Sequence, residues 1–200
     1  LRRQRQMCIR DRYQYTLDTA FDISSKNAGS EEKLALNPAG DPISNQTDDI
    51  TFNNDGTKLF AISDNGAMNI HILSTPYDIS DATLVADDGI NWRTYKEPWG
   101  SSNTTMLPQT IRFNNDGTKM YLTEAVINTT DPQESVGVVQ YNLATPFVPS
   151  STTTVQVLNL RAQFPKTNIA IHAMNFDDDG TRMYVSCLLY TSDAADEERG

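Results

Sequence analysis

Several residues and patterns that would identify a class of protein are scarce in this 200-residue sequence. It has only two cysteines and two histidines, and no apolar run approaches the roughly 20 residues that a membrane-spanning helix needs. Positive charge is also limited, because 16 Lys and Arg stand against 26 Asp and Glu, for a net charge of −10 and a pI near 4.5. Nucleic-acid binding depends on clustered Lys and Arg. We therefore expect no nucleic-acid partner and no membrane span.

Signatures of catalysis and of ion binding are missing as well. The sequence has no G-x-S-x-G elbow and no glycine-rich phosphate loop. His71 lies in an alternating segment, where we expect a structural role. The acidic run 177–179 lacks the ligand spacing of a calcium loop and is interpreted as a turn. No catalytic residue and no metal-ligand set is therefore assigned, and a non-catalytic role without a cofactor is favoured.

A repeated motif is what the sequence does contain. FNNDGTKLFAI begins at Phe52, FNNDGTKMYLT at Phe113 and FDDDGTRMYVS at Phe176, at intervals of 61 and 63 residues. Asp-Gly between alternating apolar residues is a strong hairpin signal, because glycine supplies the positive φ of a tight turn. The motif predicts hairpins at 50–63, 111–123 and 174–186.

A second motif alternates with the first. YQYTLDTAFDISS begins at Tyr13, NIHILSTPYDIS at Asn69 and VVQYNLATPFVPSS at Val138. Each copy predicts a third strand followed by a corner, and a weaker fourth strand is expected near 83–86. The best helical signal is the short segment 30–36. Each repeat of about 62 residues is therefore predicted to be a four-stranded antiparallel meander.

Together the two motifs resemble those of long-repeat bacterial and phage members of the WD40, YVTN and TolB-like β-propeller superfamily. The resemblance covers nearly all of residues 13–186 and implies an all-β fold built of propeller blades. Propellers usually close with 4 to 8 blades. Residues 13–186 hold roughly three repeats, so we expect an incomplete propeller whose missing blades belong to the same chain.

The two ends of the chain differ from the repeats. Residues 1–12 and 187–200 resemble a transposon-end sequencing adapter translated in opposite directions, because one DNA segment and its reverse complement account for both. We expect both segments to be adapter-derived and residues 13–186 to be the partial propeller. Both cysteines, Cys8 and Cys187, then lie outside the propeller.

Alignment on the Phe before each Asp-Gly turn gives one candidate site. It places Asp48, Gln109 and His172 at one equivalent position, on what would be the innermost strand. The resemblance implies that such residues line a central channel, where propeller enzymes gather metal ligands or catalytic groups. The alternative is that they are hydrogen-bonded at the start of a strand. Asp49, directly after Asp48, makes the register ambiguous.

A second candidate is the aromatic insertion GINWRTYKEPWGSSN. It holds Trp92, Tyr95 and Trp99, and the chain has no other tryptophan. Aromatic residues on an inserted loop suggest a recognition surface. The alternative is that they fix the long loop to the sheet below.

Two functions are the main hypotheses, and a third, an intracellular assembly scaffold, differs from the first mainly in compartment. The first is a non-catalytic surface module that binds a protein or a carbohydrate, with an extracellular, periplasmic or virion-associated location favoured by its Asn-, Thr- and Asp-rich, Lys-poor composition. The second is a lactonase-like propeller hydrolase with a divalent cation in its central channel, to which Asp48 and His172 would contribute.

Overall fold

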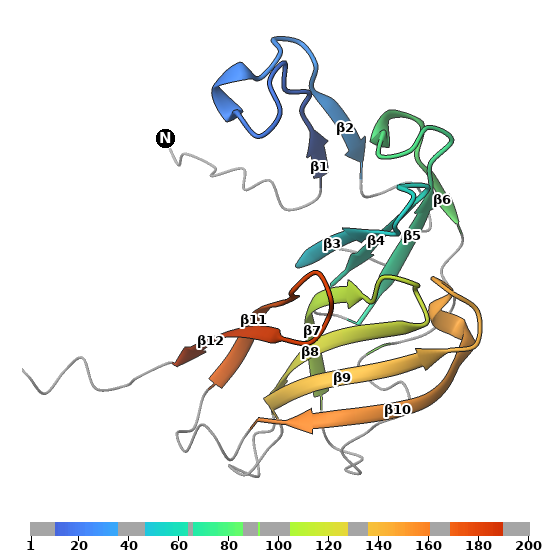
Figure 1. The fold of residues 1–200 in the computed structure, drawn as a ribbon, viewed down its shortest axis with the longest axis vertical. Coiled ribbons are helices and arrows are strands. Elements are labelled where there is room, and N and C mark those ends of the chain that lie inside the picture. The colour runs from blue at the N-terminus through green and yellow to red at the C-terminus, as the bar shows by residue number, and fades with distance from the viewer. Residues whose placement is uncertain are drawn as a thin grey trace, which may run out of the picture.

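The structure is a computed structural model, and it describes residues 11–35, 47–63, 66–85, 92, 105–127, 136–160 and 169–189 (Figure 1). These residues form an all-β fold of four antiparallel sheets, none of which closes on itself. In the described part of the chain, no helix is long and apolar enough to cross a membrane.

Two sheets have four strands each, connected as meanders in which every strand pairs with the next along the chain. Sheet 2 contains β3 (Asp49–Phe52), β4 (Lys58–Ile62), β5 (Met68–Ile72) and β6 (Thr83–Val85). Sheet 3 contains β7 (Thr105–Phe113), β8 (Lys119–Ile127), β9 (Val136–Leu143) and β10 (Thr152–Asn159). The four-stranded meander predicted from the motifs is present in both, including the weak strand near 83–86.

Two smaller sheets flank these meanders. Sheet 1 pairs β1 (Asp11–Gln14) with β2 (Glu32–Ala35), and sheet 4 pairs β11 (Ile169–Phe176) with β12 (Met183–Leu189). Three short 3-10 helices complete the fold: η1 (Ile23–Ser25), η2 (Ile79–Asp81) and η3 (Pro149–Ser151). Strands β1 and β12 each continue a few residues into the terminal segments 1–12 and 187–200.

The helix expected at 30–36 was wrong, because these residues contribute strand β2. Leu34 lies opposite Arg12 and Lys33 opposite Tyr13 in an antiparallel pair. An isolated helix of two turns is marginal in water. Pairing with β1 gives the same backbone groups hydrogen-bond partners, so the strand is favoured.

The three Asp-Gly motifs form the same turn. Gly56, Gly117 and Gly180 each have φ of 71°, and the amide of each donates to the carbonyl three residues earlier. In the first turn, the amide and hydroxyl of Thr57 both donate to Oδ1 of Asp55, at 3.0 and 2.6 Å. The corresponding Thr–Asp pairs repeat these bonds in the other two turns.

The corner motif places an aromatic residue in the left-handed region of backbone space. Phe21, Tyr77 and Phe147 have φ of 64°, 62° and 55°, which is uncommon for bulky residues. In sheet 2 the Tyr77 ring lies so close over Gly56 that an added Cβ would overlap it, and Phe147 covers Gly117 of sheet 3 in the same way. These glycines are therefore required by both the turn and the ring above it.

The main hydrophobic core lies between sheets 2 and 3. Its fully buried side chains include Phe60, Ile62 and Met68 from sheet 2 and Ile111, Met120, Leu122, Val139 and Tyr141 from sheet 3. Phe60 also packs on Phe113 across the boundary, with ring centroids 4.6 Å apart. The apolar faces predicted for the repeated strands thus meet each other rather than a helix layer.

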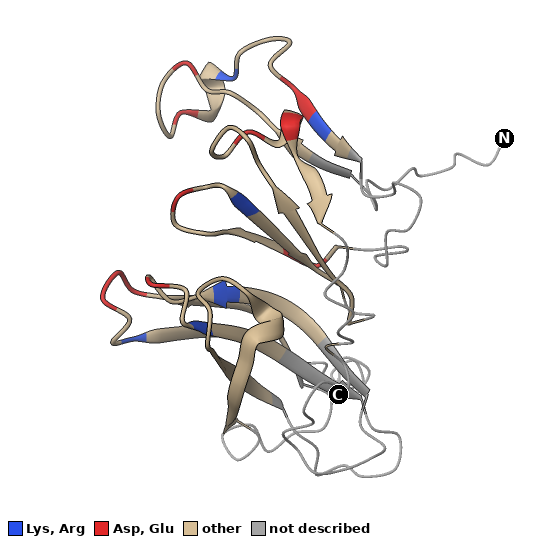
Figure 2. Cartoon of the chain, turned by 90° about the vertical axis from the view of Figure 1, so that its right-hand side faces the viewer, with Lys and Arg blue, Asp and Glu red and all other residues tan. Residues whose placement is uncertain are grey.

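Each sheet contacts the next one along the chain. Strand β7 packs against β3 on one side and β11 on the other, and η2 of sheet 2 packs against β2 of sheet 1. The sheets therefore follow one another in chain order. The Asp-Gly turns lie on one side of this row, where Figure 2 shows many of the acidic segments.

Candidate functional site

The first strands of sheets 3 and 4 are irregular at the candidate channel positions. In β7, Pro108 lies opposite Glu124 and Thr110 opposite Thr123, so Gln109 is an extra residue in the ladder. His172 is the extra residue of β11 in the same way. Asp48, the third equivalent, lies directly before β3, and its amide donates to the Ile62 carbonyl at 2.9 Å. Bulges redirect side chains and are enriched near active sites.

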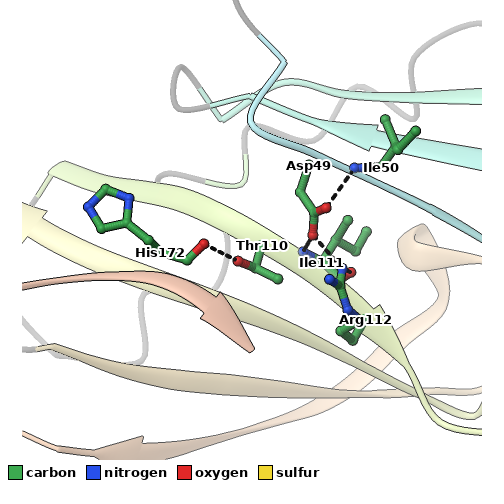
Figure 3. A network of polar contacts seen from close by, with 6 residues as sticks. All are labelled: Asp49, Ile50, Thr110, Ile111, Arg112 and His172. Atoms are coloured by element: carbon green, nitrogen blue, oxygen red, sulfur yellow. Dashed lines mark hydrogen bonds and ion pairs between the residues drawn. The ribbon is translucent and has the colours of Figure 1, made fainter. Parts of the chain in front are cut away.

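Beside these positions, the Asp49 carboxylate joins sheet 2 to sheet 3 (Figure 3). It accepts hydrogen bonds from the Ile111 amide at 3.0 Å and from the Arg112 guanidinium, with which it also forms an ion pair. The Asp49 and Arg112 side chains are 20% and 29% exposed, so this is a partly desolvated, charge-assisted contact. Asp49 is therefore bound to the next sheet by both a backbone and a side-chain donor.

Thr110 has the corresponding role between sheets 3 and 4. It occupies the position in β7 that Asp49 has in β3, and its hydroxyl donates to the His172 carbonyl at 3.3 Å. In Figure 3 the His172 ring points away from Thr110 and from the Asp49–Arg112 pair. The same position of the first strand thus connects sheet 2 to sheet 3 through a carboxylate and sheet 3 to sheet 4 through a hydroxyl.

Asp48, Gln109 and His172 therefore lie at the same position of three consecutive sheets, Asp48 directly before β3 and the other two in the bulges of β7 and β11. Asp48 and Gln109 are half-buried and His172 is exposed. The described residues contain no group of three His, Cys, Asp or Glu side chains that could hold a metal ion. Within that part of the chain, a cation site at these positions would have only the Asp48 carboxylate, the Gln109 side-chain amide and the His172 imidazole as ligands.

A second row of bonds joins the Asp-Gly turns. The Asn54 side-chain amide donates to the Asn115 carbonyl, and the Asn115 amide donates to the Asp178 carbonyl at 3.0 Å. The three residues are equivalent in the motif. Because Asp178 has a carboxylate in place of the amide, it cannot donate in the same way, so the direction of the row is fixed from sheet 2 towards sheet 4.

The described residues also form a cleft of about 310 Å³ between the turns of sheets 3 and 4. Phe176 and Tyr121 form an aromatic wall, with ring centroids 4.7 Å apart, and Lys119 and Gly180 also line the cleft. Hydrogen bonds from Thr118 and Thr181 lower the pKa of the lining carboxyls Asp116 and Asp179 below the usual value. Burial raises the pKa of Tyr121. The cleft therefore has a neutral aromatic wall and a charged rim at neutral pH.

Of the three aromatic residues expected to form a recognition surface, the structure describes only Trp92. Trp92 is fully buried in the core between sheets 2 and 3, where its ring meets Tyr141 edge-on at 5.2 Å. Its amide donates to the Gly66 carbonyl at 2.9 Å. Trp92 is therefore part of the core and offers no surface to a partner. Tyr95 and Trp99 lie outside the described residues.

Sequence reasoning missed both the cleft and the Asp49–Arg112 pair. Asp49 was noted only because it blurred the register of Asp48, and nothing in the spacing pairs it with an arginine 63 residues later. The usable signal was the repeat itself, since Asp49 and Arg112 belong to successive copies of one strand. His71 is buried within β5, consistent with the structural role expected for it.

The chain matches no family model, no curated protein and no solved structure.

Proposed function

We propose that the four sheets are complete or partial blades of a β-propeller, and that this module binds a protein or carbohydrate partner without catalysing a reaction. Blades of a propeller bury their faces only against neighbouring blades. The proposal is supported by the meander order of sheets 2 and 3 and by the core that lies between them.

The observation that carries the proposal is that polar side chains at equivalent positions form hydrogen bonds between successive sheets. Asp49 and Thr110 connect successive first strands, and Asn54 and Asn115 connect successive turns. The Asp49 carboxylate is already occupied by the Ile111 amide and the Arg112 guanidinium, which gives it a structural role between the two sheets. These groups serve to hold a rigid scaffold together, and such scaffolds present loops and turns for recognition.

Charge on the turn side favours a protein partner with a basic surface. Asp55, Asp116 and Asp179 are exposed, and hydrogen bonds from the following threonines keep their pKa values below the usual one. All three are therefore ionised at neutral pH. A row of fixed negative charges accelerates and orients the approach of a cationic partner.

The test removes charge from one turn without changing its geometry. The double variant Asp177→Asn with Asp178→Asn gives the third turn the same four-residue sequence, Asn-Asn-Asp-Gly, as the first two. We expect binding of an oligolysine probe, measured by fluorescence anisotropy at low salt, to weaken several-fold. Glu31→Gln with Glu32→Gln removes the same charge from sheet 1 and is the matched control. Equal loss in both variants would show that only net charge matters, and a glycan-array signal insensitive to both would favour a carbohydrate partner.

The alternative is a hydrolase with a divalent cation at the first strands. It is favoured by the bulges at Gln109 and His172, which stand at the positions equivalent to Asp48 in the next two sheets. Elemental analysis after dialysis tests it together with an assay of lactone hydrolysis. A stoichiometric ion that is lost in His172→Ala would support the hydrolase, whereas ion content unchanged by the substitution would count against it.

A further inference from the structure

Strand β10 is an edge of sheet 3 that lacks the usual protection against pairing. Among the described residues it pairs with β9 alone, at the edge opposite β7 (Figure 1). Exposed edge strands are normally short, or carry proline, a bulge or a charge. The corresponding strand of sheet 2, β6, has three residues, and β7 has Pro108 and a bulge at Gln109. In contrast, β10 has eight residues without proline or charge, and its register shift lies at its start, between Thr152 and Thr154.

We propose that β10 pairs with β10 of a second copy of this chain, antiparallel across a two-fold axis at Gln156, so that sheet 3 continues into the second copy. Val155 then lies opposite Val157 of the second copy, and Thr154 lies opposite Leu158. Because the pairing occupies the open edge of both copies, the assembly is closed. The inference depends on sheet 3 and not on the binding function proposed above.

The hydrogen bonds within sheet 3 determine which backbone groups of β10 point outward. The Leu143 amide donates to the Thr118 carbonyl at 2.7 Å, so the odd-numbered residues of β9 bond to β8 and the even-numbered residues bond to β10. Gln140 is one of the even-numbered residues, and its partner in β10 is Gln156. From Thr154 onward, the odd-numbered residues of β10 therefore direct their amide and carbonyl groups to the open edge.

The outward groups fit the proposed axis. Val155 and Val157 are odd-numbered, so each pair across the axis can exchange both of its backbone hydrogen bonds. Gln156 meets its own copy as a non-hydrogen-bonded pair, in which the Cα atoms are about 4.5 Å apart. An axis at either valine would also satisfy the backbone, but it would place valine opposite Thr153 or Asn159. Only the axis at Gln156 places valine opposite valine.

The side chains match on both faces in this register. Val155 and Val157 pack against the core between sheets 2 and 3, and the pairing adds the two valines of the second copy beside them. On the other face, Nε2 of Gln140 donates to Oε1 of Gln156 at 3.1 Å. The pairing extends this amide row across the axis into the second copy. It also covers Leu158, which is 47% exposed, with Thr154 of the second copy.

Charge favours a second copy as the occupant of this edge. With a net charge of −10, two copies repel each other over much of their surface. Residues 136–160, which include β9 and β10, contain no Asp, Glu, Lys, Arg or His. Two copies can therefore meet at β10 without bringing like charges together. A cationic partner would gain nothing from this uncharged strand, whereas an identical strand matches it residue by residue.

Sedimentation velocity of the whole chain over a range of concentrations tests the proposal, and we expect a reversible dimer of the 22.3 kDa chain. Gln156→Lys and Gln156→Glu should each raise the dissociation constant several-fold, because like charges then face each other at the axis. An equimolar mixture of the two variants should associate at least as tightly as the unaltered chain. Val85→Lys is the control, because Val85 pairs with Ile70 in β6 as Gln156 pairs with Gln140, and it should leave the dissociation constant unchanged.

Three outcomes would overturn the proposal. The first is a mixture that associates no more tightly than either variant alone. The second is a chain that is monomeric at every concentration; protection of the Val155 and Val157 amides from hydrogen exchange in that monomer would show that another part of the same chain covers the edge. The third is a series of species larger than a dimer, which would show open-ended strand addition.

Proline substitution tests the backbone pairing separately. Val155→Pro removes an amide hydrogen that points to the open edge, so it should raise the dissociation constant at least about tenfold. Leu84→Pro is the matched control, because Leu84 lies opposite His71 in β6 as Val155 lies opposite Tyr141 in β10. It should leave the dimer unchanged, and circular dichroism confirms that both variants fold. A dimer equally stable in both proline variants would contradict pairing through β10.

Discussion

Tyr141 and Tyr15 occupy the same position of the same motif but have opposite environments. Tyr141 is fully buried between sheets 2 and 3, where it meets Trp92. Tyr15 in sheet 1 is 47% exposed and contacts Tyr13 and the ammonium group of Lys26. The corner aromatics differ in the same way, because Phe147 covers a glycine and Phe21 is exposed. The motif thus determines local conformation, whereas burial depends on a neighbouring sheet.

The largest effect should separate these two tyrosines. Tyr141→Ala removes a fully buried aromatic ring and should lower the free energy of unfolding by about 3–5 kcal/mol. Tyr15→Ala should cost less than about 0.5 kcal/mol in dilute solution, because the ring is half exposed. Urea denaturation measures both, and Tyr141→Leu provides a milder variant if Tyr141→Ala does not fold. Similar losses at the two positions would mean that sheet 1 is buried in solution even at low concentration.

Two glycines sharpen the comparison at the turns. An alanine at Gly117 or Gly180 incurs the same backbone strain, since both have φ of 71°. Only at Gly117 does the added Cβ collide with the Phe147 ring, so Gly117→Ala should be the more destabilising by about 1–3 kcal/mol. The measurement is the difference between the two urea midpoints at low concentration. Equal costs would indicate that the Gly180 turn is also covered.

Loss of the side-chain amide bonds between successive turns should have a smaller and more local effect on stability. Asn115→Ala removes a bond that joins sheet 3 to sheet 4, and Asn54→Ala removes the equivalent bond between sheets 2 and 3. Each should cost about 0.5–1.5 kcal/mol. Sheets 2 and 3 also share the main core, so hydrogen exchange should accelerate in β11 and β12 of the Asn115 variant more than in β3 and β4 of the Asn54 variant. The reverse order would be inconsistent with a weaker attachment of sheet 4.

The smallest expected effect is on acid stability. Hydrogen bonds from Thr118 and Thr181 lower the pKa values of Asp116 and Asp179 in the folded chain. The stabilisation is therefore complete above the unfolded carboxyl pKa of about 3.9, and it is lost as pH falls through the lowered folded pKa. Thr181→Val should raise the Asp179 pKa towards its ordinary value, and Thr118→Val should do the same for Asp116. NMR titration of the carboxyl carbons measures both, and an unchanged pKa would show that the amide bonds alone are sufficient.

Local signals predicted much of this fold because they are carried by residues close together in the chain. The Asp-Gly pairs gave all three hairpins, and the alternating apolar residues gave the meanders of sheets 2 and 3. The segment 30–36 was misjudged because its strand depends on pairing with β1 about 20 residues earlier. The Asp49–Arg112 pair, the core position of Trp92 and the cleft at Gly180 depend on how whole sheets pack, and no spacing within one motif reports that.

The close approach of ring and glycine also constrains how this sequence can change over evolutionary time. At Gly117 any side chain collides with Phe147, and a smaller residue at 147 would leave Phe113 uncovered, because the two rings now lie 5.3 Å apart. Either change alone passes through a less stable chain. We therefore expect the turn glycine and the corner aromatic to be replaced together or not at all, so that each corner is inherited as a unit with the hairpin it covers.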